Sequence, residues 1–266
     1  MSEFVKRTIT AFFMIIIAFV LIEFLPLIYF SIILFLLISG AAYEFIKLCN
    51  PEKYSYFLIF FTGFIIALSF TFKEFDLKMA IIIVVFFIGM FFLFKERQKK
   101  DLTTFIRDIG IHFLIIFYIY VPLYFLFELK KIGPNYLFFL IFVIAIGDSG
   151  AYFLGSVIGK HKIYPVASPK KSLEGVIAAI VFASISGWLS KLIFPVDVTL
   201  WIAIVTGGII GFISQVSDPV ESLFKRAANK KDSSSILPGH GGILDRVDSY
   251  IFCAPILFYI IEYFWK

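Results

Sequence analysis

Charged residues are scarce in this sequence. Only 16% of its 266 residues are Asp, Glu, Lys or Arg, against roughly 25% in an ordinary soluble domain. Apolar residues make up 61%, and 36 of them are Phe. A water-soluble core of this size would leave large apolar patches exposed to solvent. The composition therefore excludes a soluble globular protein and makes lipid the solvent for most side chains.

Cysteine is almost absent, and strong net charge is absent as well. Cys49 and Cys253 lie in or beside apolar runs and form no disulfide or metal-binding pattern, so we interpret both as small buried apolar side chains. The net charge is a modest +5, and no nucleic-acid partner is expected. Lys6 and Arg7 precede an apolar stretch, as in a signal peptide, but no small-residue cleavage site follows, which predicts a retained helix.

Long apolar runs dominate the chain instead. Their length favours membrane-spanning helices, because barrel strands would alternate over about ten residues. Phe24–Pro26 predicts a tight hairpin, with Pro26 suited to start the second helix. Nine runs lie near residues 8–25, 27–46, 54–72, 79–94, 109–129, 135–147, 174–193, 199–217 and 249–265.

The distribution of basic residues supports this count. With the N-terminus in the cytoplasm, 18 Lys and Arg residues fall on the cytoplasmic side and 6 on the other. We therefore predict an all-α integral membrane protein of about nine transmembrane helices, with the N-terminus cytoplasmic and the C-terminus outside. Residues 1–266 would form a single polytopic membrane domain. Its N-terminal helices, residues 1–134, carry little chemistry, and residues 135–266 carry the catalytic helices and cytoplasmic loops.

Acidic residues gather in the stretch from 216 to 249. Asp218 lies where the eighth run ends, and Asp245 and Asp248 stand three residues apart before the ninth, so a helix would place them on one face. Such carboxylates repel one another unless a cation neutralises them, and Mg²⁺ prefers oxygen ligands. Alternatively, Asp245 and Asp248 are first-turn residues that the helix dipole favours.

Basic residues and glycines lie between these acids. Lys225, Arg226, Lys230 and Lys231 could serve only to set topology or to contact anionic lipid. Topology alone does not require the run from Gly239 to Gly242, whose backbone can approach a phosphate closely. Together these features predict phosphoryl or nucleotidyl transfer. His240 is then either a turn residue or a phosphate-contacting donor.

A second polar window covers residues 147–175. Ala151, Gly155 and Gly159 recur every four residues, which is typical of close helix packing. Asp148 at a membrane helix end requires a partner. Two readings remain for the cluster near the seventh run: a helix cap beginning at Ser168-Pro169, or a phosphate clamp. The cluster consists of Lys170, Lys171, Ser172 and Glu174.

Both windows resemble one family. The first reads Ser222-Leu-Phe-Lys225-Arg226, then Lys231-Asp232, then Leu237-Pro-Gly-His240-Gly-Gly-Ile-Leu-Asp245-Arg246-Val-Asp248. It is similar to the signature of phosphatidate cytidylyltransferases, also called CDP-diacylglycerol synthases, at every defining position. The second window resembles another segment of that family, through Asp148, Ala151-Tyr152, Gly155, Gly159-Lys160, Ser168-Pro169, Lys171-Ser172 and Glu174-Gly175. The N-terminal half matches in hydropathy only.

The resemblance implies a nucleotidyltransferase of phospholipid biosynthesis that converts CTP and phosphatidate to CDP-diacylglycerol and pyrophosphate. It implies Mg²⁺, with K⁺ beside it, a multi-pass cell membrane location with the active site on the cytoplasmic side, contact with bilayer lipid, and a homodimer. The implied metal ligands are Asp218, Asp245 and Asp248. The implied catalytic residues add Lys225, Arg226, Lys231 and Arg246, whose cations would face phosphates. The implied substrate-binding residues are Asp148, Lys171, Ser172, Ser222, His240, Gly241 and Gly242.

Other membrane functions fit less well. A CDP-alcohol phosphotransferase requires an Asp-Gly-x-x-Ala-Arg start, which does not occur in this sequence. A transporter would place ionisable residues near the middle of its spans, where this chain has almost none. The alternative that stays open is a CTP-dependent membrane phosphotransferase resembling polyprenol kinases.

Overall fold

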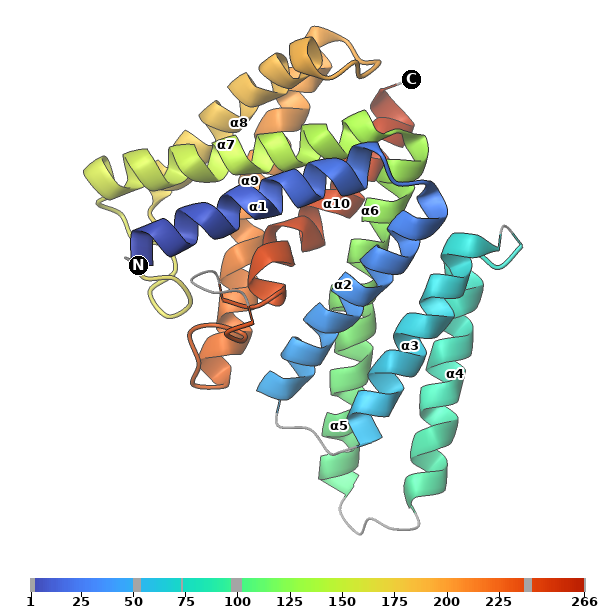
Figure 1. The fold of residues 1–266 in the computed structure, drawn as a ribbon. Helices are drawn as coiled ribbons and strands as arrows, with labels where there is room; N and C mark the ends of the chain where they lie inside the picture. Colours follow the sequence, from blue (N-terminus) through green and yellow to red (C-terminus); the bar gives the residue numbers. More distant parts are fainter. Residues whose placement is uncertain (1–2, 50–53, 73, 97–101, 237–240, 266) are drawn as a thin grey trace.

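The computed structural model describes residues 3–49, 54–72, 74–96, 102–236 and 241–265. Within these ranges the chain is helical, apart from turns and one isolated bridge between Lys162 and Ser172. Figure 1 shows the helices coloured in chain order, with the start of α1 at the left and the end of α10 at the upper right. The helices are α1 (Glu3–Glu23), α2 (Leu27–Leu48), α3 (Tyr54–Thr71), α4 (Leu77–Glu96), α5 (Leu102–Ile115), the π-helical turn η1 (Ile116–Tyr120), α6 (Val121–Ile132), α7 (Pro134–Ile158), α8 (Leu173–Ile193), α9 (Leu200–Ala227) and α10 (Leu244–Phe264).

Each predicted apolar run falls on a helix of the described chain. The fifth run covers a continuous rod made of α5, η1 and α6. Pro122 has no N–H to donate to Tyr118, and the wider π turn lies directly before it. Among the described residues, seven helices are long and apolar enough to cross a membrane. The apolar parts of α1 and α3 are shorter, Phe12–Glu23 and Ser55–Thr71. The chain is thus a multi-pass membrane protein by length and composition of its helices.

Apolar side chains cover both the inside and the outside of the helix bundle. The interior holds fully buried side chains such as Ile38, Phe45 and Phe139. Outward-facing side chains are equally apolar, and Phe86 and Trp201 remain 69% and 76% exposed. This distribution is expected for helices whose outer faces contact lipid, and it explains the composition.

Close packing of α7, α8 and α9 builds the part of the bundle that carries the polar windows (Figure 1). A Cβ atom at Gly207 of α9 would lie 3.1 Å from the Gly187 Cα of α8 and would collide with the Ala183 carbonyl oxygen. Gly147 of α7 lies against Ala183 in the same way, with 3.2 Å between the two Cβ positions. Glycine at these positions lets the helix backbones approach one another closely.

The hairpin and the helix ends agree with the sequence-based prediction at some positions and differ from it at others. The predicted turn at Phe24–Pro26 is confirmed, because α1 ends at Glu23 and Pro26 directly precedes α2. By contrast, the runs that end near residues 147 and 217 continue as helix to Ile158 and Ala227, and α10 begins at Leu244 rather than at residue 249. Hydropathy falls where polar residues enter the sequence. The helical hydrogen bonds of the backbone nevertheless continue, because those polar side chains pair with one another inside the bundle. Much of both predicted loops is therefore helix.

Candidate functional site

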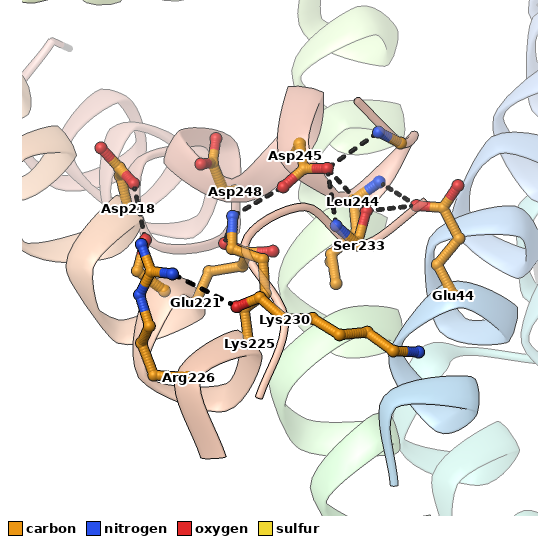
Figure 2. A network of polar contacts seen from close by, with 12 residues as sticks. Glu44, Asp218, Glu221, Lys225, Arg226, Lys230, Ser233, Leu244, Asp245 and Asp248 are labelled. Carbon is orange, nitrogen blue, oxygen red and sulfur yellow. Dashed lines mark hydrogen bonds and ion pairs between the residues drawn. The ribbon is translucent and has the colours of Figure 1, made fainter. Parts of the chain in front are cut away.

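A buried cation lies where the C-terminal part of α9 meets the start of α10 (Figure 2). Lys225 forms ion pairs with Glu221, one turn earlier in α9, and with Asp245 in the first turn of α10, where Nζ lies 2.6 Å from Oδ1. Glu221 is completely buried and Lys225 is only 7% exposed. Charges this deep in a protein are stable only when paired, so the three side chains form one electrostatic unit.

The Asp245 carboxylate organises the loop that precedes α10. Besides Lys225, it accepts hydrogen bonds at Oδ2 from the Ser233 N–H (2.9 Å), the Ser233 Oγ (2.8 Å) and the Gly242 N–H (2.8 Å). Asp245 thereby ties the loop to α9 through Lys225, and both of its oxygens are occupied.

Glu44 supports the same loop from the other side (Figure 2). This carboxylate lies near the end of α2, is 1% exposed, and accepts from the backbone N–H groups of Ile243 (3.0 Å) and Leu244 (2.9 Å). The Ser233 and Ser234 hydroxyl groups also lie within hydrogen-bonding distance of it, at 2.8 and 2.6 Å. Our sequence analysis missed Glu44 because it treated the N-terminal helices as nearly featureless. A lone acid inside an apolar helix was the available signal.

The glycines of the loop fit closely against these carboxylates. Gly241 has a φ of +79°, and a Cβ there would lie 2.6 Å from Asp245 Oδ2. A Cβ at Gly242 would collide with Ser233 Oγ and with Glu44. Glycine is therefore required by the loop conformation itself. The Gly242 N–H, which we predicted to contact a phosphate, donates to Asp245 here, and His240 lies outside the described residues.

A second group of polar side chains joins α7, the start of α8, and α9. Lys171 Nζ lies 3.0 Å from Asp218 Oδ2, and Ser222 Oγ lies 3.4 Å from Asp218 Oδ1. Asp148, one helix away, accepts at Oδ1 from Gln215 Nε2 at 2.7 Å. The helical extension beyond residues 147 and 217 is what brings Asp148 and Asp218 onto facing helices.

Asp148, Lys171, Gln215 and Asp218 border a polar cavity of about 530 Å³. Its lining combines lysines, carboxylates and glycines. The lining residues are Asp148, Ala151, Tyr152, Gly155, Ser156, Gly159, Lys162, Pro169, Lys170, Lys171, Ser172, Gly175, Gln215 and Asp218. The small residues Ala151, Gly155 and Gly159 thus serve helix packing only in part. A Cβ atom added at Gly155 would lie 3.3 Å from the Gly175 Cα, and both glycines line the cavity.

The segment before α8 is held by two hydrogen-bonding side chains. Ser172 is the N-cap, and its Oγ accepts from the Gly175 N–H at 3.2 Å. The cap therefore lies at Ser172 and not at Ser168-Pro169, where the helix-cap reading had put it, because the chain turns before it enters the helix. Glu174 accepts from the Lys160 N–H at 3.2 Å and contacts His161 Nδ1 at 2.5 Å. These contacts fix the wall of the polar cavity.

The three predicted metal ligands, Asp218, Asp245 and Asp248, have different neighbours in the structure. Asp248 lies near Asp218 and Glu221, and its Oδ1 accepts from the Ser249 N–H at 2.7 Å. Glu221 uses Oε2 for Lys225, whereas, among the described residues, its buried Oε1 and the buried hydroxyl of the nearby Tyr118 lack a hydrogen-bond partner. No three His, Cys, Asp or Glu side chains of the described part already converge on one point. An all-oxygen, acidic set of this kind nevertheless suits Mg²⁺, which takes only one or two carboxylates and completes its shell with water and phosphate.

The remaining predicted residues lie outside this network. Arg226 is exposed and donates from Nη1 to the Lys230 carbonyl oxygen at 3.4 Å. Lys231 is also exposed, in the connection after α9. Arg246 points away from Asp245, toward an apolar groove on the other side of α10. The structure thus brings Lys225 and Asp245 together, and Lys171, Ser222 and Asp218 together. Besides Glu44, our sequence analysis missed Glu221, Gln215 and Ser233.

Comparisons with known proteins show the family of this chain. A profile of the cytidylyltransferase family matches residues 5–264. A phosphatidate cytidylyltransferase of Staphylococcus saprophyticus is 34% identical over 182 residues, which cover 68% of each chain. Proteins of the same name from Staphylococcus epidermidis and Staphylococcus aureus are 34% and 38% identical over 150 and 151 residues, which cover 56% of this chain and 58% of theirs. The match extends over nearly the whole chain, and the chain belongs to the cytidylyltransferase family.

Proposed function

We propose that the protein transfers the cytidylyl group of CTP to phosphatidate, giving CDP-diacylglycerol and pyrophosphate. The observation that carries this proposal is the polar cavity, whose lining includes Lys162, Lys170 and Lys171 together with the carboxylates of Asp148 and Asp218. A triphosphate needs cations for its oxygens, and a metal-bound triphosphate also needs carboxylates. The family match and the names of the relatives support the same reaction.

The chain's own residues would bind and orient the two anionic substrates. Lys162 and Lys170 are exposed, so they are available to a nucleotide arriving from water. Lys171 is already paired with Asp218 and would exchange this partner for a phosphate when the nucleotide binds. Gly155 and Gly159 have no side chains, so the ligand can approach the backbone of the cavity wall closely.

A divalent cation, Mg²⁺, is part of this proposal. Asp218 and Asp248 are the carboxylates suited to hold it, because Asp245 is engaged by Lys225, Ser233 and Gly242 and would have to release Lys225 to reach the ion. When bound, the ion would neutralise phosphate charge during the transfer. The K⁺ ion implied by the resemblance stays a prediction.

The chemical step requires little proton transfer from the protein. A phosphatidate oxygen forms a bond to the α-phosphorus of CTP while the bond from that phosphorus to the bridging oxygen breaks, and pyrophosphate leaves. The phosphomonoester has a second pKa near 6, so it is largely dianionic at neutral pH and needs no general base. The task of the protein is to hold two anions in line and to screen their repulsion.

The membrane arrangement belongs to the proposal as well. We propose nine spans in one polytopic domain, with the N-terminus and the site on the cytoplasmic side, where CTP is available and the phosphatidate headgroup reaches the surface. The 18-to-6 distribution of Lys and Arg supports this orientation. The homodimer implied by the resemblance stays a prediction.

Purified protein in detergent, given Mg²⁺, labelled CTP and phosphatidate, tests the reaction. We expect a lipid-soluble cytidine product that depends on phosphatidate and is lost when Asp218 is replaced by Asn. Product formation with a polyprenol but not with phosphatidate would instead favour a CTP-dependent kinase. The Glu128→Gln variant is a matched control, since Glu128 lies at the end of α6 and pairs locally with Tyr124 and Lys131.

A further inference from the structure

An apolar groove of about 560 Å³ runs between α1 and α2 and ends at the first two turns of α10. It is separate from the polar cavity and shares no lining residue with it. Almost all of its wall is aliphatic or aromatic, including Met14, Ala18 and Leu21 of α1 and Phe30 of α2. The groove is open along α1, where Ile17 lines it and is still 54% exposed.

One cation stands at the end of this apolar groove. Arg246, Val247 and Tyr250 of α10 and the preceding residue Ile243 line it, with the spacing of a single helical face. The guanidinium of Arg246 has no ion-pair or hydrogen-bond partner in the part of the chain that the structure describes, and the residue is exposed. The preceding residue, Asp245, points instead to Lys225 and the buried polar network. The first turn of α10 therefore presents a cation to the apolar groove and a carboxylate to the polar site.

We propose that this groove binds an acyl chain of the phosphatidate substrate, with Arg246 contacting the lipid phosphate. This inference rests on the proposed function and adds a location for the lipid. A planar guanidinium on an apolar wall matches a ligand with a phosphate at one end and a hydrocarbon chain behind it. An acyl chain seated there places the headgroup at the turn of α10 that also carries Asp245 and Asp248, while a nucleotide occupies the polar cavity lined by α7, the start of α8 and α9.

Charge complementarity selects this occupant over other apolar ligands. A neutral lipid or a detergent would leave the arginine without an anionic partner. A helix of another protein copy would need an acidic residue at the matching position. Phosphatidate supplies both parts in one molecule and reaches the open side of the groove from the bilayer.

Narrowing the groove tests the proposal. Ala18→Phe adds a ring to the groove wall, and Ile16→Phe on the same helix is the matched control, because Ile16 is 42% exposed and does not line the groove. For Ala18→Phe we expect the KM for dioleoyl phosphatidate to rise about tenfold, with the KM for CTP unchanged and a smaller effect with dioctanoyl phosphatidate. An unchanged KM for the long-chain lipid in a folded Ala18→Phe protein overturns the proposal.

Photo-crosslinking of the wild-type protein gives a second test that does not depend on a variant. Phosphatidate with a diazirine near the end of one acyl chain should label the α1 segment Met14–Ile22 and the facing part of α2. Labelling confined to α8 and α9 overturns the groove assignment. If wild-type protein forms CDP-diacylglycerol from phosphatidate and the tests do not implicate the groove, only the location of the lipid is refuted. Wild-type protein that forms no such product refutes the proposed function itself.

Discussion

Glu44 offers the sharpest test of how the site is held together. Replacing it with Ala removes the acceptor for the Ile243 and Leu244 N–H groups and for two serine hydroxyls. The hydroxyls can turn elsewhere, since Ser233 also contacts Asp245 and Ser234 is partly exposed. The two backbone donors cannot. At about 1–3 kcal/mol for each unsatisfied buried donor, we expect a loss of roughly 2–6 kcal/mol in the stability of the loop conformation.

Glu44→Gln is the milder form of this change. The amide keeps one acceptor oxygen but turns an NH₂ group toward donors, so we expect roughly half of the effect of Ala. Because the loop carries Ser233 and Gly242, which both hold Asp245, kcat should fall at least about tenfold while the protein stays folded. Assays of CDP-diacylglycerol formation, with thermal unfolding measured in parallel, provide the comparison.

The control for Glu44 is Glu128→Gln, which removes a carboxylate that accepts from Tyr124 at 2.8 Å far from this loop. Its kcat should match that of the wild type. Wild-type kcat in a folded Glu44→Gln protein would refute the idea that this residue anchors the site.

Further substitutions test the buried charges of the site, the packing of its loop and the packing of α9 against α8. Lys225→Met leaves Glu221 buried without its cation and should destabilise the protein by about 3–5 kcal/mol, visible as a lower melting temperature. Adding Glu221→Gln should restore stability but not turnover. Gly242→Ala pushes a methyl group into Ser233 and should abolish turnover with little change in melting temperature. Gly207→Val forces α9 away from α8 and should lower stability by about 2–3 kcal/mol, whereas Gly89→Val, in open space on α4, should not.

The helical rods were predictable because apolar runs of spanning length leave the backbone no alternative inside lipid. The helix ends were not, since Asp148 and Asp218 lower the local hydropathy while their partners Gln215 and Lys171 keep them inside the fold. Those partners lie more than 40 residues away along the chain, where no local pattern reveals them.

The candidate site, too, was predictable from the sequence only in part. Asp245 and Lys225 were recognisable by their residue types and by the resemblance, but not as partners of each other. Glu44 lies 200 residues from the Leu244 N–H that it binds, so only the folded chain reveals its role. The resemblance implied only that Arg246 faces a phosphate, and the structure adds that the helical turn directs it to the apolar groove, because neighbouring residues on a helix face different sides.

In the proposed reaction the α-phosphorus of CTP, and not its γ-phosphorus, is transferred to lipid. Purified protein in bilayers containing both phosphatidate and a polyprenol can be supplied with CTP labelled at either position. We expect the α label to enter the lipid fraction as CDP-diacylglycerol, while the γ label is released only in pyrophosphate. Recovery of the γ label in the lipid fraction would contradict the proposed reaction.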